Sequence, residues 1–136
     1  MSYEVWGSDD DFYGPDWRDD AVDAGWIDPD DLSPGVIAIW QERQRQQDVE
    51  GWTAEHDDRH GPGALAGSAS AYAMSAAAMA VVGSDEPVLK EPPPFLGFSA
   101  DWWKPKSRRQ DLVRAGALIA AEIDRLDRQE RGAQDD

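Results

Sequence analysis

The sequence predicts an all-α domain of three main helices, preceded by an irregular acidic arm. Two segments begin with residues that cap helices and carry apolar side chains at helical spacing, and a third is rich in alanine, the best helix former. The alternating pattern of a strand never extends beyond a few residues. We therefore assign residues 1–34 to the arm and residues 35–133 to the helical domain.

The arm holds most of the excess negative charge. It contains 11 acidic residues, one basic residue (Arg18) and six aromatic residues, in a chain whose formal net charge is -15. Such a field repels phosphates, so direct binding to nucleic acid is not expected, whereas a basic protein partner or imitation of DNA is compatible with it. Because a purely solvating tail has few aromatic residues, we expect the arm to dock on its own domain or on a partner.

The first helix is predicted to begin at Ser33, a good N-cap, with Pro34 at its first position and Gly51 as its stop. One face of this helix is apolar at its start and becomes polar toward its end, and Ile39 is expected to keep the first half of the face buried. A helix with this pattern either borders a cavity or emerges into solvent. The residues of the face, at 4-3-4-3 spacing, are Val36, Trp40, Arg43, Gln47 and Glu50.

The following loop gathers possible metal ligands. The stretch EHDDRH holds both histidines of the chain and three carboxylates: Glu55, His56, Asp57, Asp58 and His60. Oxygen and imidazole ligands suit Mg²⁺, Mn²⁺ or Zn²⁺. The alternative is that the carboxylates only form turns and cap the next helix.

Residues 64–82 form the second predicted helix, and its small side chains let a neighbouring helix approach closely. It is mostly alanine and is interrupted by serines, so we expect a soluble helix rather than a membrane span. Residues 83–100 are rich in proline, which excludes regular helix there and predicts a partly extended connector.

The last helix is the clearest element. Ser107 and Gln110 form a capping-box pattern, and Gly132 is the expected end. An apolar seam at 4-3-4-3 spacing predicts packing along a partner helix. The seam consists of Leu112, Gly116, Ile119, Ile123 and Leu126. Because three helices with so few bulky side chains bury a thin core, we expect a homo-oligomer to complete the bundle.

Cations gather beside tryptophans in the stretch DWWKPKSRRQDLV, which leads into this helix. Arg108 and Arg109 fall in its first turn, where free N–H groups and the helix dipole already favour an anion. Lys104 lies just before the helix, and Trp102 or Trp103 offers a face on which a base can stack. Two occupants suit this site: a flat anionic ligand such as a nucleotide, or the protein's own acidic arm.

Glu122 lies at the edge of the apolar seam of the last helix. There it could meet Glu42 or Glu50 around a divalent metal, the arrangement of a phosphohydrolase. The alternative is an internal salt bridge to Arg43.

Several enzyme classes are excluded or disfavoured by missing motifs. The chain has no G-x-S-x-G, no G-x-x-x-x-G-K-[ST] and no G-x-G-x-x-G, so the usual serine-hydrolase and phosphate-loop signatures are lacking. It has no cysteine, which excludes disulfides and thiolate chemistry. The first residues lack the pattern of a signal peptide, and we expect a cytoplasmic protein.

Two stretches carry a resemblance to known proteins. ERQRQQDVEGWTAEHDDRHGPGALAGSASAYA and WWKPKSRRQDLVRAGALIAAEIDRLDR resemble small proteins common in bacteriophages and prophages. Their shared pattern is roughly E-G-W-T-x-E-H-D-D-x-H, G-x-L-A-x-A-A-x-x-Y-A, then W-W-K-P-x-x-x-R-R-x-L-V-x-A-G-A-L-I-x-A-E-I-x-R-L-D-R, and this chain departs from it at Gly67 and Ser70. The resemblance covers about residues 42–128 and implies a phage origin.

In outline the chain is also similar to two functional classes. Nucleotide pyrophosphohydrolases of the MazG type chelate Mg²⁺ through E-x-x-E and E-x-x-D on facing helices, but here Arg45 and Arg125 replace the second acid of each motif. Phage anti-defence sponges of the Thoeris-inhibiting type bind a cyclic nucleotide signal without cleaving it. Proteins of this second class need only aromatic residues that stack on a base, arginines that bind phosphate and an oligomer that encloses the ligand.

We therefore expect a phage-encoded oligomer in the host cytoplasm that sequesters a nucleotide-derived immune signal and needs no cofactor. Phosphate would be held by lysine and arginine, a base would stack on tryptophan, and the histidine loop would close the site. The expected ligand-binding residues are Arg43, Glu50, His56, Asp57, Asp58, His60, Trp102, Trp103, Lys104, Arg108 and Arg109.

Two alternatives stay open. In a Mg²⁺-dependent pyrophosphohydrolase, the metal would be held by Glu42, Glu50, Asp57 and Glu122. In an acidic decoy, residues 1–34 would bind a host defence protein and no cavity would be needed.

Overall fold

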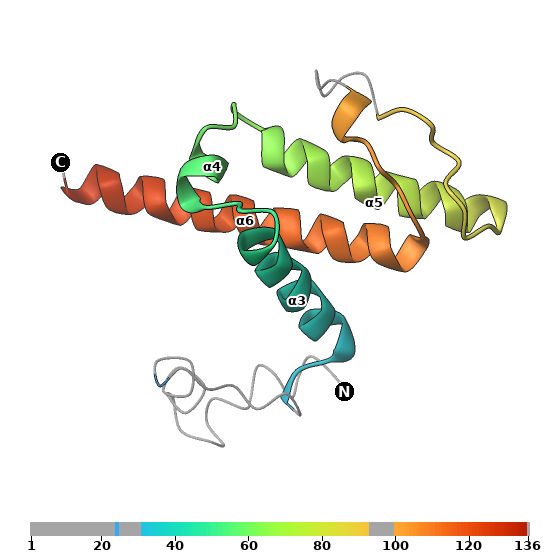
Figure 1. The fold of residues 1–136 in the computed structure, drawn as a ribbon, viewed down its shortest axis with the longest axis horizontal. Helices are drawn as coiled ribbons and strands as arrows, with labels where there is room; N and C mark the ends of the chain where they lie inside the picture. Colours follow the sequence, from blue (N-terminus) through green and yellow to red (C-terminus); the bar gives the residue numbers. More distant parts are fainter. Residues whose placement is uncertain (1–23, 25–30, 93–99, 136) are drawn as a thin grey trace. The chain divides into compact units, whose positions relative to one another are not determined.

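A computed structural model describes Ala24, residues 31–92 and residues 100–135. The described residues contain helices and no strands, which confirms the predicted all-α class. The helices are α3 (Pro34–Asp48), α4 (Ala54–Asp58), α5 (Ala64–Val82), the short 3₁₀ helix η3 (Ala100–Trp102) and α6 (Arg108–Asp135) (Figure 1). Nearly all of the arm lies outside the described residues, so its expected docking stays a prediction.

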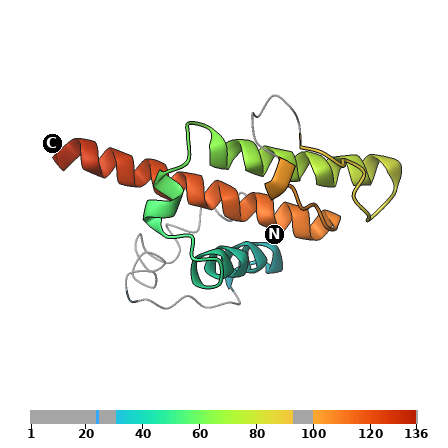
Figure 2. The same ribbon diagram turned by 45° about the horizontal axis from the view of Figure 1, so that its top comes forward.

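The core lies between α5 and α6, which run side by side in both views (Figures 1 and 2). The buried row of α5 includes Leu65, Ala69, Tyr72 and Met79, at the 4-3 spacing of one helix face. The facing residues of α6 are mainly alanines, and Trp103 closes the cluster from the preceding loop. Small side chains therefore face small side chains, and the two helices pack closely.

The start of α6 is fixed by side chains on both sides of its first turn. The hydroxyl of Ser107 accepts a hydrogen bond from the Gln110 N–H at 3.1 Å, which confirms the predicted cap. Asp85, in the turn after α5, accepts from the Arg108 N–H at 2.9 Å. The helix does not end at Gly132 as expected but continues to Asp135. A single helical glycine costs only about 1 kcal/mol, so it need not stop a helix.

α3 lies next to α6 (Figure 1), and a glycine of α6 is at their contact. A Cβ at Gly116 would lie 2.6 Å from Cδ1 of Ile39. The absence of a side chain at Gly116 therefore allows α3 to approach α6 this closely. The row that faces inward contains Arg43 and Gln46, both buried. The predicted inward face was therefore wrong at Val36, Trp40 and Gln47, which are exposed, Trp40 to 58%. The contact of Ile39 with Gly116 turns that side of α3 outward.

The seam of α6 is half exposed within this chain. Leu112, Ile119, Ile123 and Leu126 are each about half accessible, whereas the buried row is offset by one position and includes Ala115 and Leu118. The reason is that α5 offers alanines, and the small residues of α6 give the closer contact. The expected partner for the seam is thus not found among the described residues of one chain.

α5 is, among the described helices, the one that is long and apolar enough to span a membrane by length and composition. Core helices of soluble proteins meet the same criteria, and eight α5 side chains are buried here. One of them is Ser75, whose hydroxyl donates to the buried carboxylate of Asp111 at 2.9 Å. A polar bond to α6 fits the role of a core helix.

Candidate functional site

Two adjoining cavities open between α3, α4, α5 and α6. The first has a volume of about 400 Å³ and the second of about 530 Å³, both within the usual range for small-molecule sites. Four residues line both cavities, so the two spaces meet. These shared residues are Arg45, Glu50, Lys104 and Arg114.

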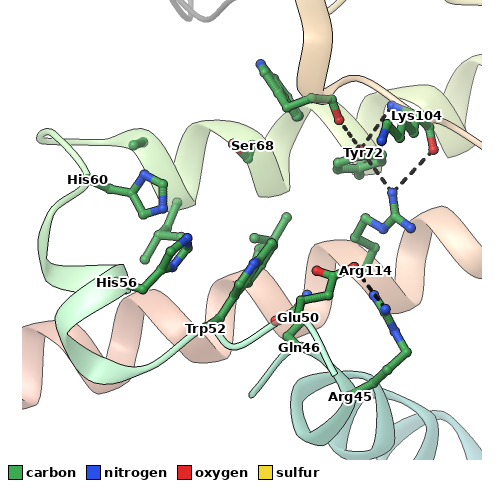
Figure 3. A pocket seen from close by; sticks show the side chains of 14 residues that line it. Arg45, Gln46, Glu50, Trp52, His56, His60, Ser68, Tyr72, Lys104 and Arg114 are labelled. Atoms are coloured by element: carbon green, nitrogen blue, oxygen red, sulfur yellow. Dashed lines mark hydrogen bonds and ion pairs between the residues drawn. The ribbon is translucent and has the colours of Figure 1, made fainter. Parts of the chain in front are cut away.

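The first cavity is largely aromatic. Trp52 and His56 are stacked, with ring centroids 5.3 Å apart and planes within 13° of each other. The ring of His60 meets that of His56 edge-on at 4.9 Å. Tyr72 and Trp102 line the same space from α5 and from the loop before α6. Figure 3 shows the two histidine rings and the indole following one another along one wall.

The hydroxyl of Tyr72 makes hydrogen bonds to three residues around this cavity. The hydroxyl donates to the carbonyl oxygen of Trp102 at 3.2 Å and accepts from the backbone N–H of Lys104 at 3.2 Å. It also accepts from the guanidinium of Arg114 at 3.1 Å, and that guanidinium lies 5.0 Å from the centre of the tyrosine ring. One residue of α5 therefore contacts the guanidinium of Arg114 and the backbone of Lys104, two cationic residues at the same end of the cavity (Figure 3).

Positive charge collects in the second cavity. Lys104, Lys106, Arg109 and Arg114 line it, and none of the four has a carboxylate at ion-pair distance among the described residues. The fifth cation, Arg45, differs because it pairs with two glutamates, which also line this cavity. The five cations outnumber the two carboxylates, so the lining of the second cavity has a net positive charge in a strongly acidic chain.

Arg45 is bound on both sides by glutamates. It pairs with Glu42 at 2.7 Å and with Glu50 at 2.9 Å. The hydrogen bonds from Arg45 hold the pKa of the Glu42 carboxyl below its ordinary value. The carboxylates of Glu42 and Glu50 are therefore both paired with the same guanidinium.

At the other end of the first cavity, α4 positions a cluster of titratable groups. The hydroxyl of Thr53 caps α4 by accepting from the His56 N–H at 3.1 Å. Asp57 is fully buried, with one carboxylate oxygen 2.9 Å from Arg43 and the other 3.2 Å from Nδ1 of His56. Partial desolvation lowers the pKa of His60, and the neighbouring His56 adds to the effect.

Six of the expected ligand-binding residues line the cavities. The first cavity is lined by Glu50, His56, His60, Trp102 and Lys104, and the second by Glu50, Lys104 and Arg109.

The other five expected residues lie elsewhere. Arg43 and Asp57 form a buried ion pair that does not line either cavity. Asp58 pairs at the surface with an arginine near the end of α6, Arg128, at 2.8 Å. Trp103 is in the core and donates its indole N–H to a backbone carbonyl at 3.0 Å. Arg108 faces Asp85 instead of either cavity.

Sequence reasoning missed several lining residues, chiefly Arg45, Gln46, Trp52, Tyr72 and Arg114. Helical spacing could have identified two of them. Arg114 lies on the row of α6 that also carries the buried Asp111 and Leu118, and Gln46 follows Arg43 by three positions on α3.

The four carboxylates named for Mg²⁺ do not fit a magnesium centre. Glu42 and Glu50 both bind Arg45, Asp57 binds Arg43, and Glu122 binds Arg125 instead of the expected Arg43. Each therefore has an arginine partner, and no three of the four carboxylates gather at one place among the described residues. Within the described ranges, three possible ligand side chains gather at one place alone, at His56, Asp57 and His60.

Comparison with protein-family models, with curated proteins and with solved structures found no match to this chain. The chemistry of the two cavities is therefore the basis for assigning a function.

Proposed function

We propose that this protein binds a nucleotide-derived anion in the two adjoining cavities and sequesters it. One observation carries the proposal: four cations without carboxylate partners meet beside an aromatic cavity, in a chain with a formal net charge of -15. Clustered like charges repel one another, so an anion bound among them lowers the free energy of the site. A flat, anionic molecule suits both the cations of the second cavity and the aromatic side chains of the first.

The two parts of such a ligand fall into different cavities. Its phosphates bind to Lys104, Arg109 and Arg114 in the second cavity, where guanidinium groups offer paired donors. Its base lies in the first cavity beside Trp52 and Trp102, because indole faces stack on any base.

Gln46 adds a polar group at the base end. Its side chain is 1% exposed and lines the first cavity, and its Oε1 has no hydrogen-bond partner among the described residues. Leaving a buried acceptor unmatched costs about 1–3 kcal/mol. A donor on the base, or a water molecule between the two, recovers that cost.

Sequestration is a better match than hydrolysis to the carboxylates of the cavity. Glu42 and Glu50 are both held by Arg45, so neither is free to activate water or to ligate Mg²⁺. A ligand released from this site is expected to be chemically unchanged. We place the protein in the cytoplasm of an infected cell, where a phage-encoded binder of cyclic nucleotide signals blunts host immunity.

The half-exposed seam of α6 supports a second part of the proposal, a homo-oligomer. Leu112, Ile119, Ile123 and Leu126 keep the 4-3 spacing of a helix that packs along another helix. Among the described helices, α6 has the greatest length and carries this seam, so a second α6 is its natural partner. We therefore take a second copy of this chain as the occupant.

The test is retention followed by release. The purified protein is mixed with a panel of linear and cyclic nucleotides, filtered and heat-denatured, and both fractions are analysed by mass spectrometry. The double variant Lys104→Gln/Arg109→Gln should weaken retention by about tenfold or more, since hydrogen bonds to charged groups contribute about 1.5–3 kcal/mol each. Arg131→Gln is the matched control, because this exposed arginine of α6 lines neither cavity.

The outcomes separate the functions. A ligand that is retained by the wild type, lost by the double variant and recovered intact supports sequestration. Recovery as a hydrolysed product would replace the proposal with the pyrophosphohydrolase. Retention of nothing in the panel, or equal retention by the double variant, would refute it and leave the acidic arm and a protein partner as the lead.

A further inference from the structure

The histidine end of the first cavity has a geometry that the nucleotide proposal does not use. One ligand atom each from His56, Asp57 and His60 lies within 4.8 Å of the other two. The Nδ1 of His56 and the Oδ1 of Asp57 are 3.2 Å apart. Two ligands of a tetrahedral metal bound at about 2.0 Å are separated by about 3.3 Å, so this pair already matches one edge of such a site.

Neighbouring groups orient these side chains. Asp57 is fully buried and is fixed by its other oxygen, which pairs with Arg43 at 2.9 Å. The ring of His56 is stacked against Trp52, which sets its plane. Metal sites depend on such outer contacts, because they hold the ligands in place before the metal arrives. The third ligand, His60, follows α4 and is the most exposed of the three.

We infer that His56, Asp57 and His60 form a binding site for a divalent transition metal of the Zn²⁺ class. Two imidazoles and one carboxylate form a donor set that suits Zn²⁺ or Co²⁺ better than Mg²⁺ or Ca²⁺, which prefer oxygen ligands alone. In the metal-free protein, Nδ1 of His56 and Oδ1 of Asp57 are hydrogen-bonded to each other. When a metal binds to Nδ1, the imidazole proton lies on Nε2 instead, and the metal replaces the hydrogen bond between the two residues.

Three protein ligands leave an open position, which is typical of metal sites that bind a further ligand. Both histidines line the first cavity together with Trp52, so a further ligand would reach the metal from that cavity. Figure 3 shows the histidines at one end of the cavity and Lys104 and Arg114 at the other. A bound metal therefore meets the end of the cavity remote from the cations, where a ring nitrogen of a ligand rather than its phosphate would coordinate.

The experiment uses the full chain and the metal alone, with no nucleotide present. Protein stripped with a chelator is titrated with Co²⁺, whose visible absorption reports the coordination geometry, and with Zn²⁺ by calorimetry. We expect one metal per chain, the absorption of a four-coordinate cobalt centre, and at least a tenfold loss of affinity in His60→Ala. Because His60 is exposed, this variant should retain the fold, which circular dichroism checks.

Asp58→Asn is the matched control. This carboxylate lies in the same acidic stretch but faces Arg128, so metal binding should be unchanged. If the wild type takes up less than one metal per chain, or if His60→Ala binds Co²⁺ and Zn²⁺ as the wild type does, the inference is wrong. Because no nucleotide is used, failure here leaves the proposed sequestration untouched, and failure of the nucleotide test leaves the metal site untouched.

Discussion

Substitution of Gly116 tests whether α3 packs against α6 through this glycine. That contact also sets the position of Arg45 and Gln46, the α3 residues that line the first cavity. A methyl group at this position would lie 2.6, 2.8 and 3.2 Å from three side-chain atoms of Ile39. Because all three contacts are close, rotating the end of the isoleucine side chain does not relieve them, and its branched Cβ restricts χ1. Gly116→Ala must therefore displace α3 or strain Ile39.

Two effects of known sign oppose each other in this substitution. Overpacking of this kind costs about 1–3 kcal/mol. Alanine in place of glycine within a helix recovers about 1 kcal/mol. We therefore expect Gly116→Ala to destabilise the wild-type protein by up to about 2 kcal/mol. In an Ile39→Ala background the clash is absent, so the same substitution should stabilise by about 1 kcal/mol.

The assay is urea unfolding followed by tryptophan fluorescence, at one fixed protein concentration, for the four proteins of the double-mutant cycle. Gly132→Ala is the control, since a Cβ there meets nothing within 4 Å and should have one effect in both backgrounds. A change of sign at Gly116 between the backgrounds supports the packing described. Equal effects in both backgrounds would show that α3 does not rest on this glycine.

Four further outcomes are expected. Arg43→Met should lower the free energy of unfolding by about 3–5 kcal/mol in urea, because it leaves the Asp57 charge buried without its partner. Tyr72→Phe should cost about 1–3 kcal/mol in the same assay and weaken nucleotide retention, because Lys104 and its neighbouring arginine lose a shared anchor. The pKa of Glu42 is lower in the folded state, so its contribution to stability is present above its unfolded pKa and is lost as pH falls through the folded pKa. The urea midpoints of the wild type and Glu42→Gln should therefore converge in acid and separate near neutrality. Ile123→Glu should shift the mass measured by light scattering toward the single chain, and an unchanged mass would argue against pairing through α6.

The sequence predicted the elements of this fold better than their rotation. Capping residues and alanine content are local signals, so the start of α6 and the full span of α5 agree with the structure. The face that each helix buries is decided by its neighbours. Trp40 is outward because Ile39 fits Gly116, a contact between residues far apart in sequence.

The same limit applies to the candidate site. Composition identified the cationic stretch, but Trp102 and Trp103 are adjacent, and only the loop geometry places one at the cavity and the other in the core. Arg43 and Arg45 both follow Trp40 on α3, and their partners decided their roles. Arg43 meets the buried Asp57, and Arg45 lies at the junction between two glutamates.

The alanines between α5 and α6 have a consequence for selectivity. Ala69, Ala115 and Ala121 are buried where the two helices meet, and none of them lines either cavity. They act as spacers, because the size of these side chains sets the distance between α5 and α6, and both helices supply residues that line the first cavity. A larger side chain at one of these positions should push the helices apart, at a cost of about 1–3 kcal/mol for overpacking. The width of the cavity would then change while the residues that line it stay the same.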